Sequence, residues 1–265
     1  MIKTWYIIGA ENRFIDADAQ AFLTAAGITN TNIIEAINDL VVGLKANNLW
    51  AKMFAIYPFT GGTLNSNKLN LKNPADTNAA FRLSFVNSWS HTLSGSQPTN
   101  PSASYANTFL MPSAVQNVNS NGFGIYITAN TLTSADPCPI GSYITATQAS
   151  SMGVSNTAIF SRLNATSING SITGGQGSFD AHKTSATLTQ VFKNGILVAQ
   201  GNSGGTLPVQ NIFLGTLNIN GNPYTSGWVN CTFRFAYISQ GLQSTEVATL
   251  RNIVQTYQTK LGREI

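Results

Sequence analysis

Residues Phe233–Leu250 read FRFAYISQGLQSTEVATL and contain the two patterns that decide the fold. In the first half, aromatic residues alternate with smaller or polar ones, which is the period of a β-strand. We therefore expect a strand over residues 231–239. A single face of this strand is expected to carry Cys231, Phe233, Phe235 and Tyr237.

The second half of this stretch changes to the period of an α-helix. Ser244 or Thr245 can cap the helix, and Glu246 in its first turn suits the positive end of the helix dipole. Gly262 is the expected stop. The apolar positions recur at spacings of three and four residues, at Val247, Leu250, Val254, Tyr257 and Leu261. The pattern is too short to indicate a coiled coil, so we expect this helix to pack against the sheet.

Upstream of the strand, the sequence contains many short runs with a period of two. Asn194-Gly195 lies between two apolar runs and predicts a hairpin with a type I′ turn. Closely spaced strands separated by turn residues are typical of a two-sheet sandwich or a barrel. Other strands are expected over residues 80–86, 124–128, 142–147, 158–163, 185–192 and 209–215.

The N-terminal part is helical instead. Asp16 is expected to cap a short helix that ends at Gly27. Asn32 is expected to cap a second helix, because Glu35 follows it by three residues. An amphipathic stripe on the second helix is expected to pack on the body of the protein, through Ile34, Ile37, Val41 and Leu44.

The composition excludes several classes of function. Only 9% of the 265 residues are charged, and the net charge of +4 is not gathered into a Lys/Arg cluster, so we expect no nucleic-acid binding. No apolar run reaches the roughly 18 residues of a membrane span. The apolar patch within residues 1–10 is too short for a signal peptide, so we do not expect export by the usual route.

Catalytic groups are scarce. A sandwich glycosidase needs two carboxylates about 5 to 10 Å apart. Between Asp76 and Glu246 the only carboxylates are Asp136 and Asp180, which lie in different segments. No catalytic residue, metal or cofactor is expected, although a calcium ion at the rim, held by Asp136 or Asp180, stays open. The two cysteines, Cys138 and Cys231, are expected to be buried thiols, with one long-range disulfide as the alternative.

Two loops have a composition suited to sugar recognition. An aromatic face can stack on the apolar face of a sugar ring while amides and hydroxyls bind its hydroxyl groups. The alternative is that Trp89 and Trp228 are core or rim packing residues. The candidate ligand-binding residues of the two loops are Trp89, His91, Tyr105, Asn222, Tyr224 and Trp228.

The strand and helix over 233–250 resemble the last strand and following helix of laminin G-like, concanavalin A-like sandwiches, and Phe192–Val198 resembles a hairpin of the same fold. This resemblance implies a mainly β, concanavalin A-like jelly-roll sandwich. We expect an N-terminal helical segment and connector over residues 1–60. The sandwich with its closing helix is expected over residues 61–265.

Most of the chain is more specifically similar to short bacteriophage and prophage proteins of Bacteroidota-type hosts. The matching pieces are residues 16–29, 52–62, 70–76 and the closing Leu261-Gly-Arg263. The resemblance implies a non-enzymatic protein of the virion surface, such as a head fibre, decoration protein, spike or tail adhesin. Other virion proteins, host-surface glycan and further copies of the chain are the expected partners. One alternative is a free carbohydrate-binding module or lectin. A sandwich glycoside hydrolase is a second and less favoured alternative, because the carboxylates are few and lie in different segments.

Overall fold

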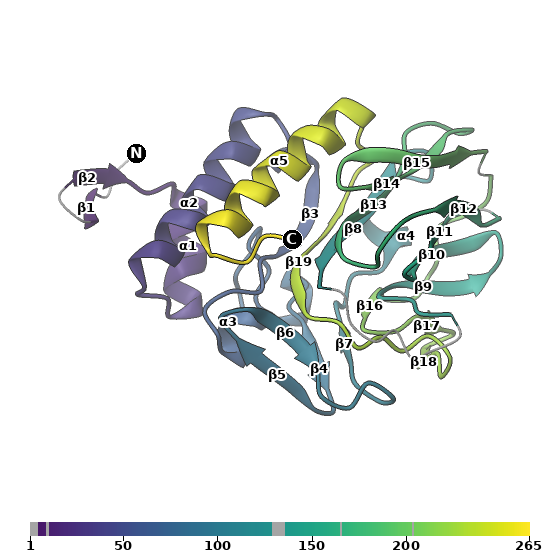
Figure 1. The fold of residues 1–265 in the computed structure, drawn as a ribbon, viewed down its shortest axis with the longest axis horizontal. Coiled ribbons are helices and arrows are strands. Elements are labelled where there is room, and N and C mark those ends of the chain that lie inside the picture. The colour runs from purple at the N-terminus through teal and green to yellow at the C-terminus, as the bar shows by residue number, and fades with distance from the viewer. Residues whose placement is uncertain (1–4, 9–10, 129–135, 165, 203) are drawn as a thin grey trace.

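Two β-sheets packed face to face form the body of the protein, and helices cover the outer face of one of them (Figure 1). The mainly β sandwich closed by a C-terminal helix is thus confirmed. A separate hairpin of β1 (Trp5–Ile8) and β2 (Glu11–Phe14) stands beside the helices. The computed structural model describes residues 5–8, 11–128, 136–164, 166–202 and 204–265.

The eight-stranded sheet is built around β8 and β19, which pair antiparallel over most of their length. Both strands are buried on both faces, since one face meets the second sheet and the other meets the helices. In spatial order the sheet contains β15 (Ile196–Gly201), β14 (Thr189–Lys193), β13 (Gly177–Lys183), β8 (Asn121–Ile127), β19 (Phe233–Ser239), β6 (Gly95–Pro98) and β5 (Trp89–Thr92), with β3 (Met53–Tyr57) also paired to β19.

The nine-stranded sheet forms the opposite layer. A short strand, β17 (Asn218–Ile219), pairs in parallel with β9 and antiparallel with β18 (Asn222–Pro223). The remaining strands are β12 (Ile168–Ser171), β11 (Ala158–Leu163), β10 (Gln148–Val154), β9 (Ile140–Thr145), β16 (Phe213–Leu214), β7 (Tyr105–Asn107) and β4 (Ser84–Val86) in spatial order.

The main core lies between the sheets, where alternate residues of facing strands are fully buried. Each buried Phe or Ile side chain contributes about 1.5 to 3 kcal/mol through the hydrophobic effect. The core includes Phe123, Ile125 and Ile127 of β8, Met152 and Val154 of β10, and Ile159 and Leu163 of β11.

Turn residues explain where the predicted strands agree with the structure and where they do not. The predicted hairpin is confirmed, because Asn194 and Gly195 both have positive φ between β14 and β15. The strand expected over residues 80–86 is wrong in its first half. A 3₁₀ turn over Asn78–Ala80 is followed by Phe81 at a φ of 59°, so only the last three residues pair as β4.

A second core lies between the eight-stranded sheet and three helices, α1 (Ala17–Ala26), α2 (Thr31–Ala46) and α5 (Ser244–Lys260). Figure 1 shows α2 and α5 side by side, and the apolar stripes of both helices are buried in this core. Asp16 caps α1, and Gly27 ends it in the left-handed conformation, as expected. None of the helices in the described part of the chain is long and apolar enough to cross a membrane.

The caps predicted for the other two long helices are wrong by one or two residues. α2 begins after Asn30, not Asn32, because the Asn30 side chain accepts a hydrogen bond from the backbone N–H of Ile33. α5 is capped by Gln243, whose own backbone N–H donates to Glu246 in a capping box. In α2 the cap side chain bonds to the third residue of the helix, and in α5 the side chain of the third residue bonds back to the cap.

The single aromatic face expected for residues 231–239 is also wrong. The pairing with β8 shifts register between Phe233 and Phe235, which leaves Arg234 as the extra residue of a β-bulge. Cys231 and Phe233 therefore point into the sandwich core, whereas Phe235 and Tyr237 point under the helices. The predicted boundary at residue 60 stays a prediction; β3, which precedes it, pairs with β19.

The C-terminal tail is tied to the eight-stranded sheet by a buried arginine. The Arg263 guanidinium donates to the backbone oxygens of Phe59 at 2.8 Å and Leu93 at 3.1 Å. Two residues later, the backbone N–H of Ile265 donates to the hydroxyl of Tyr126 at 2.7 Å. These contacts hold the end of the chain against strands that are far from it in sequence. The short helices α3 (Leu64–Lys68) and α4 (Pro112–Val115) and a 3₁₀ turn over Trp50–Lys52 complete the fold.

A chain of three buried polar side chains lies under the helices. The Tyr237 hydroxyl donates to Asp180 Oδ1 at 2.7 Å and lies 2.9 Å from Nε2 of His182. The backbone N–H of Leu242 donates to Nδ1 of His182, so this network assigns the remaining proton to Nε2. Burial raises the pKa of Asp180 to about 7 and lowers the pKa of His182 to about 3.

Glycines on β8 make room for this network. Gly124 is paired with Asp180, and Gly122 with His182. A Cβ atom at Gly124 would lie 2.2 Å from Asp180 Oδ1, and one at Gly122 would lie 2.1 Å from His182 Nδ1. Any larger side chain at these two positions would displace the buried polar groups.

The two opposite pKa shifts predict an unusual pH dependence. At about pH 5 the folded protein holds its proton on Asp180 and the unfolded chain holds it on His182, so the stability of the wild type should change little from about pH 4.5 to 6. Asp180→Asn removes the folded-state proton. Its free energy of unfolding should then fall by about 1.4 kcal/mol per pH unit below about pH 6.5.

Urea unfolding at several pH values measures this slope, with Asp136→Asn, an exposed carboxylate, as the control. His182→Gln leaves only the Asp180 proton, so its stability should instead rise as the pH falls through about 7. A profile of Asp180→Asn as flat as that of the wild type would contradict the assignment.

Candidate functional site

Three of the predicted binding residues pack along the edges of the two sheets. The Trp89 ring lies 5.0 Å from Phe85 and 6.0 Å from Phe233, measured between ring centroids. His91 is half-buried, also contacts Phe85, and has its Nδ1 atom 3.0 Å from Ser96 Oγ. Burial lowers the pKa of this imidazole. Each ring is thus already engaged with protein groups.

The third residue of this loop, Tyr105, stacks on Phe213 with ring centroids 4.5 Å apart. In the second predicted loop, Trp228 is buried and Asn222 is exposed. Only Tyr224 lines a large pocket, where its hydroxyl lies 3.4 Å from Asp136 Oδ2. The structure therefore does not gather the six predicted residues at one site, and a binding role for the other five stays a prediction.

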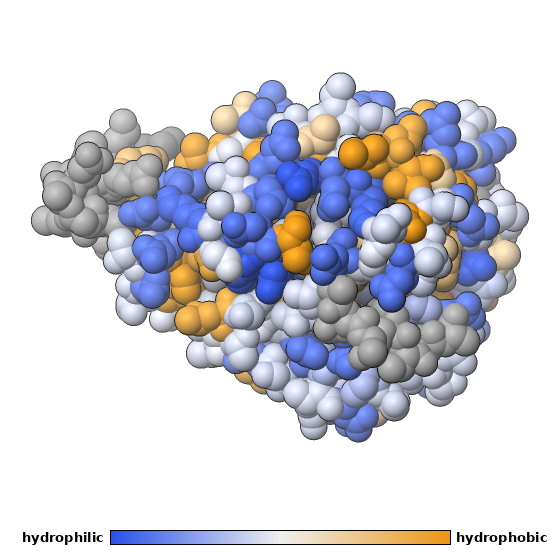
Figure 2. All heavy atoms as spheres, in the orientation of Figure 1, coloured by the Kyte–Doolittle hydropathy of each residue, from blue (hydrophilic) through white to orange (hydrophobic). Residues whose placement is uncertain are grey.

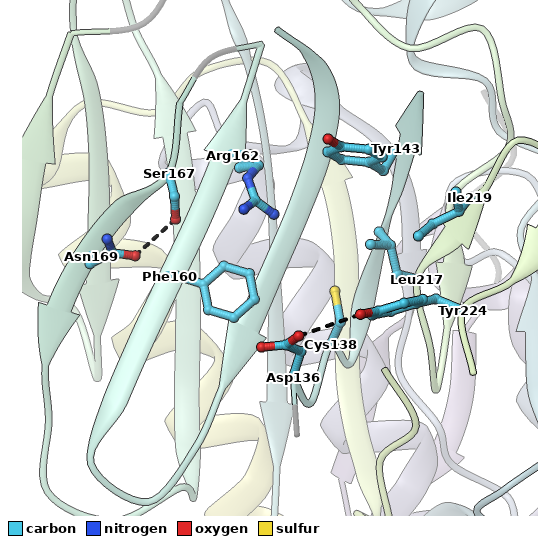
Figure 3. A pocket seen from close by; sticks show the side chains of 10 residues that line it. All are labelled: Asp136, Cys138, Tyr143, Phe160, Arg162, Ser167, Asn169, Leu217, Ile219 and Tyr224. Atoms are coloured by element: carbon cyan, nitrogen blue, oxygen red, sulfur yellow. Dashed lines mark hydrogen bonds between the residues drawn. The ribbon is translucent and has the colours of Figure 1, made fainter. Parts of the chain in front are cut away.

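The pocket lies on the outer face of the nine-stranded sheet, the face that no helix covers. Phe160 and Arg162 of β11 turn into it, because they alternate with Ile159 and Leu163, which point into the core (Figure 3). Its volume is about 480 Å³, within the range of small-molecule sites. It is lined by Asp136, Cys138, Tyr143, Phe160, Arg162, Ser167, Asn169, Leu217, Ile219 and Tyr224.

Small residues on the central strands create the hollow. Gly153 of β10 is paired with Phe160, and Ser151 is paired with both Arg162 and Gly141. Residues directly opposite each other in a sheet share a face, so these small side chains lie among the large ones that surround the pocket. A Cβ atom at Gly153 would lie only 1.9 Å from the ring of Phe160. The absence of that atom lets the Phe160 ring lie against the sheet.

The pocket combines aromatic, charged and amide groups. The Arg162 guanidinium lies 5.6 Å from the centroid of Phe160 and 5.7 Å from that of Tyr143. At β12, which pairs with β11, the Ser167 hydroxyl donates to Oδ1 of Asn169 at 2.8 Å (Figure 3). This set can stack on a flat ligand and bind its polar groups from two sides.

The described lining of the pocket contains one carboxylate and not the pair of a glycoside hydrolase. Asp136 is its one carboxylate, while Asp180 faces the helices across the eight-stranded sheet, so the two acids lie on opposite outer faces of the sandwich. Cys138 and Cys231 are both free and buried, which confirms the thiol prediction. Burial raises the pKa of Cys138 to about 12, so its sulfur is a protonated thiol at neutral pH. Within the described residues, no three Cys, His or acidic side chains converge as metal ligands.

Half of the residues that line the pocket were missed by the sequence analysis because they lie in strands: Tyr143, Phe160, Arg162, Asn169 and Ile219. The segment Ala158–Leu163 was predicted as a strand with its observed bounds, and its alternation places Phe160 and Arg162 on the face opposite the core. An outward aromatic residue beside an arginine, in a chain with 9% charged residues, was the available signal.

No protein-family model matches the sequence, and none of the curated proteins is detectably similar to it. Solved structures with the same fold include that of botulinum neurotoxin type C, whose cell entry depends on interaction with two ganglioside molecules. The TM-score is 0.54 at 17% identity, over 79% of this chain and 53% of that one.

The binding domain of botulinum neurotoxin DC in complex with rat synaptotagmin II gives a TM-score of 0.53 at 13% identity, over 78% and 52% of the two chains. A further match is domain 4 of AbnA, an extracellular arabinanase from Geobacillus stearothermophilus, in complex with arabinotriose. Its TM-score is 0.48 at 14% identity, over 76% of this chain and 98% of that one. This chain spans about half the length of the two neurotoxin chains. At these identities the likeness shows a shared β-sandwich fold.

The contact between Gly153 and Phe160 can be tested by a double-mutant cycle. Gly153→Ala should destabilise the protein by about 1 to 3 kcal/mol, because the added methyl group pushes the Phe160 ring out of place. In a Phe160→Ala background the same change should cost much less, since the ring is gone. Urea unfolding of the four proteins measures the coupling. Gly204→Ala, at a position with open space, is the control, and additive effects would contradict the contact.

Proposed function

We propose that this protein is a non-enzymatic glycan-binding domain whose ligand occupies the pocket on the nine-stranded sheet. The observation that carries the proposal is the open pocket of about 480 Å³ with the aromatic rings of Tyr143, Phe160 and Tyr224 in its lining. Aromatic rings stack on the apolar face of a sugar ring. Two of them come from strands of a rigid sheet, which favours a preformed site over an adaptable loop.

Polar groups of the pocket supply the hydrogen bonds that such a ligand needs. The carboxylate of Asp136 can accept bonds from sugar hydroxyls, and the amide of Asn169 can donate and accept. Botulinum neurotoxin type C, a protein of the same fold, interacts with gangliosides, which supports a glycan ligand for a sandwich of this kind. A pocket with one carboxylate has no acid pair for glycoside hydrolysis, which supports binding without cleavage.

We further propose that the domain is displayed on a bacteriophage virion and attaches to glycan of the host surface. This part rests on the sequence resemblance, above all on residues 16–29, 52–62 and 70–76. The exposed face in Figure 2 is compatible with display, because polar residues dominate it and the hydrophobic ones form small, separate areas. Further copies of the chain and other virion proteins are the proposed partners.

A glycan array tests the binding proposal. The wild type should bind a defined set of glycans, and Phe160→Ala and Tyr224→Ala should each weaken that binding about 10-fold or more, since each removes a stacking surface. Tyr105→Ala is the matched control, an aromatic residue of the other predicted loop that packs on Phe213 outside the pocket. If Tyr105→Ala lowers affinity while the pocket variants do not, the site lies in the first predicted loop.

The virion proposal has its own test. Mass spectrometry of purified particles from the source genome should detect the chain, and labelled antibodies should bind intact particles. Particles that never contain the chain would leave a free lectin or carbohydrate-binding module as the better description.

A further inference from the structure

Arg162 is the one cation in the lining of the pocket. The whole chain has only 14 Lys and Arg residues, and here one of them is placed at the centre of a wall and not on the exposed surface. Its guanidinium lies between two aromatic rings, at similar distances from Phe160 and Tyr143. Aromatic contacts of this kind restrict an arginine to a defined orientation.

No acidic side chain neutralises this arginine within the described part of the chain. The ion pairs among the described residues all involve other cations: Lys45, Lys52, Lys68, Arg82 and Lys260. Asp136, the carboxylate of the same pocket, lies beside the Tyr224 hydroxyl (Figure 3). The pocket thus offers a positive group and a negative group that form no ion pair with each other.

A second polar group lies beside Arg162 with its hydrogen-bonding capacity unused. Ser151 is directly opposite Arg162 in the β10–β11 ladder, and its fully buried hydroxyl has no hydrogen-bond partner within the described residues. Cross-strand partners share a face of the sheet, so this hydroxyl and the guanidinium belong to the same surface. A buried polar group without a partner is costly, although Ser151 itself is not among the residues that line the pocket.

We propose that the pocket recognises an acidic glycan, through a sugar carboxylate bound by Arg162. This inference rests on the proposed function and adds the chemical class of the ligand. A guanidinium presents its N–H groups in one plane, and a planar carboxylate accepts two of them at once. Asp136 then accepts hydroxyl donors from the uncharged part of the same ligand and repels a second carboxylate at that end.

The experiment compares ligands that differ only in charge. Oligosaccharides of uronic acids and of sialic acids are printed beside their carboxyl-reduced counterparts. A third set carries a sulfate ester on oligosaccharides that have no carboxylate. The wild type should bind the carboxylate forms at least about 10-fold more tightly than the reduced forms, and this preference should shrink as salt is added. Arg162→Gln should lose this preference and bind the two forms with equal affinity.

Two further variants separate charge from geometry and from general effects. Arg162→Lys keeps the charge without the planar fork and should recover only part of the preference. Arg82→Gln is the matched control, because Arg82 also lies near an aromatic ring, that of Phe109, but outside the pocket. This variant should keep the full preference of the wild type.

The outcomes distinguish this inference from the proposed function. If the wild type binds neutral glycans in a Phe160-dependent manner but shows no preference for carboxylates, the inference is overturned and glycan binding stands. A preference for the sulfate esters alone also overturns it, because sulfate is not the planar partner that we propose. If no glycan binds, or if Phe160→Ala has no effect on binding, both proposals fail.

Discussion

The architecture depends on one strand that is buried on both faces. β19 pairs with β8 along one edge and with β3 and β6 along the other, so it holds together segments from both ends of the chain. The bulge at Arg234 divides its aromatic residues between two cores. Phe233 packs between the sheets, and Phe235 and Tyr237 pack beneath α2 and α5. The bulge thus gives each of the two cores a part of the aromatic side chains of this strand.

This division leaves the two outer faces of the sandwich with different roles. The eight-stranded sheet gives its outer face to the helices, and its polar residues there are neutral partners in a buried network, as Asp180 and His182 are at intermediate pH. The nine-stranded sheet has no helical cover. Small residues on its central strands, Gly153 and Ser151 among them, turn the uncovered face into a pocket.

Local sequence signals predicted local structure well. Asp16 and Gly27 bound α1 as expected, and Asn194-Gly195 forms the predicted hairpin, because capping and tight turns depend on a few neighbouring residues. The bulge at Arg234 was missed, because it arises from register with β8 and leaves no mark in the alternation of β19 itself. A mainly β sandwich or barrel could be predicted despite this error, since that class needs only the number and spacing of strands. The resemblance to concanavalin A-like domains then pointed to the sandwich.

The pocket could not be predicted, because its walls come from three segments that only the sheet brings together: residues 136–143, 160–169 and 217–224. Tyr224 was found because the search looked for aromatic residues in loops, and Phe160 and Arg162 were missed because they occupy a strand. The surroundings of the few charged side chains indicate the pocket better than the loop composition does. Asp180 lies in the interior, where its raised pKa lets it stay neutral, and Lys45 and Lys260 pair with acids. Within the described part of the chain, Arg162 has neither an interior position nor an acidic partner, and because it lines the pocket a ligand is well placed to neutralise its charge.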